Sequence, residues 1–162
     1  SLPLLPLQLT LVFMFGSNVF YIVLLIGFFF WTGLARIIRA QVLSLREMTF
    51  IEAATASGAS KTYVMFRHII PNVLPIATAS MILNIPVAIF VEAGLSFLGF
   101  GDPTLATWGR MLNNAFRSDA FKNLAWWWIL PPGLAIMILC LGFVFIGHAL
   151  DEIVNPRLRS RR

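Results

Sequence analysis

Charged residues are scarce in this sequence: Asp, Glu, Lys and Arg together make up 12% of its 162 residues. A soluble domain carries about 25% charged residues, whereas 59% of this chain is hydrophobic. Residues 1–35 hold no charged side chain, and one membrane-spanning helix needs only about 20 consecutive apolar residues. The composition therefore excludes soluble, disordered and collagen-like proteins. It predicts an all-α, polytopic membrane protein embedded in the lipid bilayer.

Cysteine and histidine are also scarce. Cys140 is the single cysteine and lies in an apolar run, so the chain can form neither an internal disulfide nor a thiolate metal site. His68 and His148 lie far apart in the sequence, and neither is accompanied by paired ligands, so we predict no metal site. The net charge of +5 fits the basic cytoplasmic loops of membrane proteins and does not indicate a nucleic-acid partner.

Four apolar stretches predict membrane-spanning helices, at about residues 3–15, 19–34, 73–100 and 126–147. The first would be only about 20 Å long at 1.5 Å per residue, which is less than the roughly 30 Å of a hydrocarbon core. We therefore expect it to be part of a longer helix, and the chain to begin inside a longer polypeptide. The four helices would form a single transmembrane domain over residues 1–162.

The distribution of Lys and Arg predicts the orientation. Segment 36–72 holds five basic residues and tail 151–162 holds four, whereas loop 101–123 holds three. Cytoplasmic loops carry the excess of basic residues. We therefore expect segment 36–72 and the tail in the cytoplasm and loop 101–123 outside it.

The cytoplasmic segment contains the signals of a helix, a tight turn and a second helix. Thr49 and Glu52 have the spacing of a capping box, which predicts a helix start. Gly58 suits the left-handed position that follows a helix end, and Ser60 suits the N-cap of the next helix. Pro71 is expected to end that second helix at about Ile70, because proline removes a backbone donor.

Every residue from Ala53 to Ser60 is small, so another surface can approach this backbone closely. A short helix without a large apolar stripe is not stabilised by packing on its own chain, and we expect the helix pair to dock into a partner. The run Gly58-Ala59-Ser60-Lys61-Thr62 fails the spacing of a phosphate-binding loop, because Ser60 stands where the second glycine is required. This chain is therefore not expected to bind ATP.

The same segment resembles a known family. Glu52-Ala53-Ala54, then Gly58 after three residues, then His68-Ile69-Ile70-Pro71 after nine more, resembles the EAA loop of bacterial and archaeal ABC importer permeases. His68 and Ile70 depart from the general pattern in the way of the dipeptide and oligopeptide permease branch. Four further stretches resemble that branch, namely Glu92 to Gly99, Asp102 to Leu112, Pro132 to Ile136, and Asp151 to Arg157. The likeness covers nearly all of the chain.

This resemblance implies the transmembrane domain of a type I ABC importer in a bacterial or archaeal cell (inner) membrane. Such an importer combines a second permease subunit, two ATPase subunits and an extracytoplasmic substrate-binding protein. ATP and Mg would belong to the ATPase subunits, so this chain would carry no cofactor and no catalytic residue. Peptides are the implied substrate class, with nickel and oligosaccharides left open. The implied ATPase-coupling residues are Thr49, Glu52, Ala53, Ala54, Gly58, Ser60 and Pro71.

Two further sets of residues are candidates for function. Ser80, Asn84 and Glu92 lie at helical spacing on one face, which predicts either a face that lines the translocation pathway or, for Glu92, a hydrogen bond to a neighbouring helix or to the partner permease. A short helix is expected at about residues 108–116. Its Trp108 and Arg110 would either contact the binding protein or lie on the membrane surface.

Two alternatives remain at this point. A self-sufficient, ion-coupled secondary transporter or channel would require two or more ionisable residues inside the membrane, and only Glu92 qualifies. For Glu52, the alternative to a coupling role is that it only caps its own helix.

Overall fold

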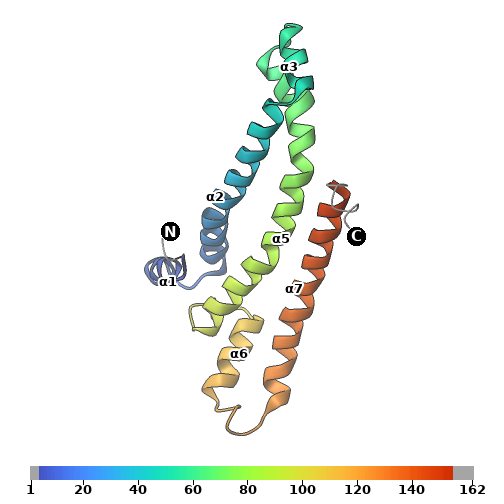
Figure 1. Ribbon diagram of the computed structural model, residues 1–162. Helices are drawn as coiled ribbons and strands as arrows, with labels where there is room; N and C mark the ends of the chain where they lie inside the picture. Colours follow the sequence, from blue (N-terminus) through green and yellow to red (C-terminus); the bar gives the residue numbers. More distant parts are fainter. Residues whose placement is uncertain (1–3, 155–162) are drawn as a thin grey trace. The chain divides into compact units, whose positions relative to one another are not determined.

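The computed structural model describes residues 4–154, which are helical apart from short connections (Figure 1). The chain divides into two compact units, one built from the described residues of Ser1–Phe30 and Asn84–Val144, and the other from those of Trp31–Leu83 and Phe145–Arg162. In chain order the elements are α1 (Leu4–Phe15), α2 (Val19–Arg46), α3 (Thr49–Ala56), α4 (Lys61–Val64), the π-helical turn η1 (Met65–Ile69), α5 (Ile70–Phe97), α6 (Trp108–Arg117) and α7 (Trp126–Val154).

Within residues 4–154, three helical stretches are long and apolar enough to cross a membrane: Val19–Arg46, Lys61–Phe97 and Trp126–Glu152. Helix α1 has 12 residues, which corresponds to about 18 Å at 1.5 Å per residue. The chain is therefore a membrane protein. The expected helix over residues 3–15 is present from Leu4, but its role as a fourth crossing stays a prediction.

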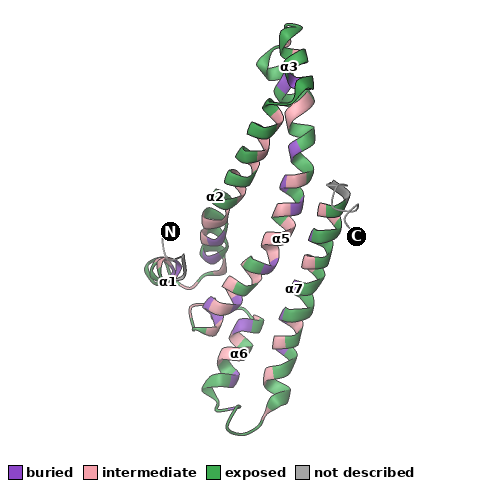
Figure 2. Ribbon diagram, in the orientation of Figure 1, coloured by how far each residue is buried: buried purple, intermediate pink, exposed green. Residues whose placement is uncertain are grey.

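Exposed residues run along these helices (green in Figure 2), and many of them carry large apolar side chains. Phe28 of α2 is 68% exposed and Ile138 of α7 is 65% exposed. Apolar surface on this scale is not left in water by folded proteins. These faces are therefore suited to contact with lipid or with other membrane helices.

The helix that begins after Ser60 does not end at Pro71, and that prediction is wrong. A continuous helical stretch runs from Lys61 to Phe97, and Pro71 lies in its interior. Proline breaks an α-helix because it lacks a donor and collides with the carbonyl four residues earlier. Here that carbonyl belongs to Arg67, inside the π-turn η1, where the Ile70 N–H donates to Met65 O five residues back. The wider turn accommodates the proline ring.

The first unit has a small apolar core. Val12 of α1, Ile22 and Ile26 of α2, and Leu95 of α5 are buried together. A second cluster joins Ala93 of α5 to Ile136 and Cys140 of α7. These contacts hold α1, the start of α2, the end of α5 and the start of α7 in one unit.

Candidate functional site

Helix α3 begins at Thr49, where the sequence predicts a helix, but the predicted capping box is not formed. The N-cap is Met48, which has no capping side chain, and its carbonyl accepts from the N–H groups of Ile51 and Glu52 at 2.9 and 3.2 Å. Thr49 therefore lies inside the first turn. Glu52 is exposed in the same turn, where a carboxylate favours the positive end of the helix dipole.

The turn between α3 and α4 is fixed by Gly58, as predicted. Its φ of 86° lies in the left-handed region. The Gly58 N–H donates to Thr55 O at 3.0 Å, and the Ala59 N–H donates to Ala54 O at 3.1 Å. These two bonds form a Schellman motif, which satisfies carbonyls at the end of α3.

Ser60 caps α4, also as predicted. Its Oγ accepts a hydrogen bond from the Tyr63 N–H at 3.2 Å. The side chain thereby satisfies a donor that would otherwise be free at the helix start. Both the end of α3 and the start of α4 are thus closed by local hydrogen bonds, which define the geometry of the helix pair.

The helix pair presents small side chains to the outside. Ile51 is buried, at 5% exposure, and anchors α3 to the rest of the unit. Four exposed residues form what we call the small-residue surface: Ala53, Ala56, Ser57 and Gly58. Because no bulky side chain covers this backbone, a partner can come close to it.

An aromatic cluster lies beside this surface. The ring centroids of Phe50 and Tyr63 lie 6.1 and 5.9 Å from that of His68. Phe50 and Tyr63 are about half exposed, at 45% and 54%. The cluster connects α3 with α4 and η1, and it adds an exposed apolar edge to the helix pair.

The side-chain carboxylate of Glu52 makes no hydrogen bond or ion pair within the part of the chain that the structure describes. Its carboxylate is therefore available to a group outside this chain. Ala54, the third residue of the Glu-Ala-Ala motif, is half-buried, and its carbonyl accepts the bond from Ala59.

The three candidate pathway residues all belong to α5. Ser80, Asn84 and Glu92 are each half-buried. The Ser96 Oγ donates to Glu92 Oε1 at 2.6 Å, one turn further along the same helix. The hydrogen bond of Glu92 is thus made within its own helix, and a role of these residues in a pathway stays a prediction.

Loop 101–107 contains a structural residue that sequence reasoning missed, Asp102. Its Oδ2 accepts from the Val19 N–H at the start of α2 at 3.1 Å. Its Oδ1 accepts from the N–H and Oγ1 of Thr104 at 2.9 and 2.6 Å. These bonds, from Thr104 first and then from Val19, together with the charge of Arg110, lower the pKa of Asp102 below its ordinary value. The carboxylate ties the loop to α2.

Arg110 also holds this loop, through hydrogen bonds to its backbone. Its Nη1 donates to the carbonyl groups of Pro103, Leu105 and Asp102. Trp108, by contrast, is 38% exposed at the start of α6, which Thr107 caps. Arg110 is thus engaged within the loop. A contact of Trp108 and Arg110 with a binding protein stays a prediction.

Comparison with known proteins identifies similar sequences over nearly the whole chain. Residues 1–160 match the family described as binding-protein-dependent transport system inner membrane component. The chain is 37% identical over 161 residues to the oligopeptide transport system permease protein OppC of Escherichia coli, covering 98% of this chain and 52% of that protein. It is 36% identical over 160 residues to OppC of Haemophilus influenzae, covering 98% and 50%. The chain therefore spans about half the length of the curated relatives it matches.

Proposed function

The chain belongs to the family of binding-protein-dependent transport system inner membrane components, and from this premise we propose that it is a permease subunit of an ATP-driven peptide importer. The names of its relatives, which refer to oligopeptide transport, support the substrate class. The exposed apolar helices support a location in a membrane, and the family description supports the inner membrane.

The helix pair carries this proposal. The small-residue surface would seat in a cleft of an ATPase subunit, with Glu52 reaching a donor of that subunit. Helix α2 ends at Arg46, just before α3, and α4 continues through η1 into α5. A displacement of the helix pair would therefore be passed to both α2 and α5. ATP shifts the equilibrium between the two conformations of the ATPase pair only if it binds one of them better than the other.

This chain would perform no chemistry itself. ATP and Mg²⁺ would be bound by two ATPase subunits, and a second permease would complete the membrane domain. An extracytoplasmic binding protein would deliver the peptide. The helix pair and the tail 151–162 would face the cytoplasm, and loop 101–123 would face outward. Ser80, Asn84 and Glu92 would contribute polar groups along α5 to the pathway.

Co-purification with the candidate ATPase subunits tests the proposed interface. Ala53→Trp adds bulk to the small-residue surface without altering the turn at Gly58, and we expect it to abolish co-purification. Ala40→Trp is the matched control, because Ala40 is an exposed alanine of α2 outside this surface. We expect the control to keep its ATPase.

If Ala53→Trp and Ala40→Trp retain the ATPase subunits equally, the interface lies elsewhere. A wild-type chain that retains no ATPase and transports in response to an ion gradient would overturn the importer proposal.

A further inference from the structure

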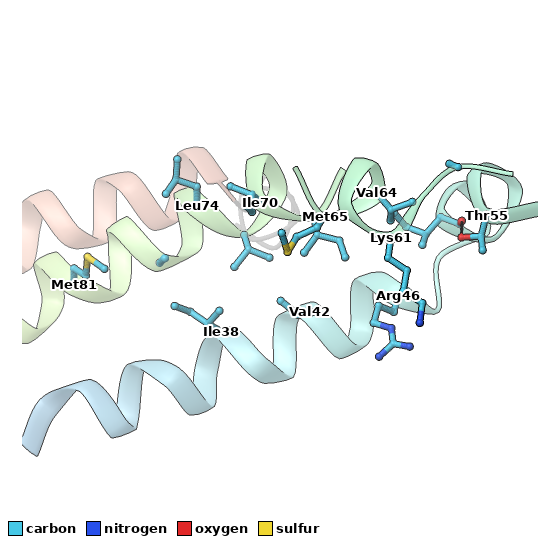
Figure 3. Close-up of a pocket in the computed structure, with 15 residues that line it drawn as sticks. Ile38, Val42, Arg46, Thr55, Lys61, Val64, Met65, Ile70, Leu74 and Met81 are labelled. Carbon is cyan, nitrogen blue, oxygen red and sulfur yellow. Dashed lines mark hydrogen bonds between the residues drawn. The ribbon is translucent and has the colours of Figure 1, made fainter. Parts of the chain in front are cut away.

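A long groove lies beside the helix pair, between the end of α2 and the stretch from α4 to α5 (Figure 3). Its volume is about 780 Å³, which is within the range of about 300–1,000 Å³ for small-molecule sites. The wall is mostly apolar, and it includes Ile38, Val42, Val73, Ala77 and Met81. All of these residues belong to one compact unit.

The groove has two cations at one end. Arg46 and Lys61 line it and lie at the same end in Figure 3, whereas Ile38 and Met81 lie toward the other. Both basic residues are exposed. Neither forms an ion pair within residues 4–154, and the neighbouring Glu47 and Glu52 do not line the groove. The residues that line the groove thus include two cations and no carboxylate, which favours an anion at this end.

On its α2 side the groove has about the length of one leaflet of a bilayer, whereas its other wall continues to Met81. Ile38 and Arg46 are eight residues apart on α2, which corresponds to about 12 Å at 1.5 Å per residue. Half of a hydrocarbon core is about 15 Å. A helix is about 10 Å in diameter. An acyl chain, a single file of methylene groups, is narrower.

We propose that this groove binds an anionic phospholipid of the cytoplasmic leaflet. An acyl chain lies along the apolar wall, and the phosphate lies between Arg46 and Lys61. The proposal rests on the orientation proposed above, in which segment 36–72 faces the cytoplasm. It does not depend on ATPase coupling. A bound lipid would fill the space next to the helix pair and connect α2 with α5 through its acyl chain.

Native mass spectrometry of the purified chain tests this site directly. The chain is equilibrated in neutral detergent with equal amounts of dioleoyl phosphatidylglycerol and dioleoyl phosphatidylcholine, and the retained lipids are counted. We expect one phosphatidylglycerol to be retained in preference. Each cation near a headgroup contributes roughly fivefold in affinity. The variant Arg46→Gln with Lys61→Gln should therefore lose roughly 25-fold in preference.

The matched control is Arg36→Gln with Arg39→Gln, which removes the same charge from exposed positions of α2 that do not line the groove. It should keep the preference. Val42→Trp places a large side chain in the groove and leaves both cations in place. It should lower the retention of both lipids. An unchanged helical circular dichroism spectrum would show that the variant is folded.

No preference in the wild type, or equal losses in the two double variants, would overturn the proposal. Unchanged retention by Val42→Trp would overturn it as well. Because no nucleotide or partner subunit is present, none of these outcomes bears on the importer proposal.

Discussion

Gly58 is the residue on which the turn of the helix pair depends. Its φ of 86° costs an L-residue about 1–2 kcal/mol. A Cβ at this position would meet nothing within 4 Å, so a substitution would act through the backbone conformation alone. We expect Gly58→Ala to weaken the turn by about 1 kcal/mol. Faster hydrogen exchange at the Ala59 N–H would report the change.

Gly33→Ala provides the comparison. Gly33 lies inside α2, has no atom within 4 Å of the added Cβ, and has an ordinary φ. Alanine is a better helix former than glycine by about 0.8–1 kcal/mol, so this variant should lose no stability. Equal exchange rates at Ala59 in the two variants would contradict the role of Gly58.

Asp102 makes the attachment of its loop dependent on pH. The lowered pKa means that its hydrogen bonds stabilise the fold fully above the ordinary value, about 3.9 for an aspartate. That contribution is lost as the pH falls through the lowered value in the folded protein. We expect Asp102→Asn to lower the melting temperature at pH 7, and the difference from the wild type to shrink below about pH 4. Thermal unfolding in detergent between pH 7 and 3 measures it. A difference that is constant over this range would contradict the assignment.

These residues show what the sequence reveals at this scale. The Gly58 N–H and the Ser60 Oγ each bond to a group three residues away, and local patterns predict such bonds well. The bond between Asp102 and Thr104 is also local, and an aspartate followed by proline and threonine could have suggested it. The bond to Val19 joins residues 83 positions apart. It depends on tertiary folding, which no local pattern contains.

At the scale of elements, α6 is held against α5 by close packing at Gly109. A Cβ there would lie 2.3 Å from the Ala93 carbonyl oxygen and 2.8 Å from Ser96 Cβ. The Asn113 amide also donates to the Phe97 carbonyl. Since a backbone carbonyl cannot rotate away, Gly109→Ala should displace α6 and cost about 1–3 kcal/mol.

Limited proteolysis of loop 101–123 would detect this displacement as faster cleavage. Gly133→Ala is the control, because Gly133 lies in α7 with nothing within 4 Å of an added Cβ. Cleavage at the wild-type rate in Gly109→Ala would show that α6 does not depend on this contact.

The extent of α6 could be predicted, whereas the path of the chain through Pro71 could not. The expected helix at about 108–116 corresponds to Trp108–Arg117, because an N-cap threonine and amphipathic spacing mark it. At Pro71 the sequence predicts an end, since proline normally stops a helix. The π-turn that accommodates it, Met65–Ile69, has no recognisable sequence signal.

At the scale of the whole molecule, the exposed carboxylate of Glu52 connects this chain to the proposed importer. It has no partner within residues 4–154, so Glu52→Ala should cost the chain no more than its interaction with the helix dipole, about 0.3–1 kcal/mol. A charge-assisted hydrogen bond to an ATPase subunit contributes about 1.5–3 kcal/mol. If that bond transmits the motion, loss of it should lower peptide-stimulated ATP hydrolysis by roughly tenfold.

The assay is ATP hydrolysis by the assembled complex in proteoliposomes, with and without peptide. Glu47→Ala serves as the control, because Glu47 is an exposed carboxylate just before α3. Full stimulation in the Glu52→Ala complex would exclude a coupling role for this carboxylate.

Composition alone predicted a membrane protein, but it did not predict how the long helices pack. Helices α5 and α7 are apolar on nearly all sides, and such helices lack the one-sided pattern that identifies a buried face. Ala93, Ile136 and Cys140 pack together, while equally apolar side chains such as Phe90 and Ile138 stay exposed. Hydrophobicity alone therefore does not determine which of these side chains are buried.

The π-turn η1 also determines how α4 is rotated about the helix axis relative to α5. A π-turn is equivalent to one extra residue inserted into an α-helix, and each residue of an α-helix advances by about 100°. The residues of α4 are therefore rotated by about 100° relative to a regular continuation of α5. Removing one residue from Met65–Ile69 would restore the regular spiral. It would also turn Lys61, and the small-residue surface with it, away from the direction that they now face.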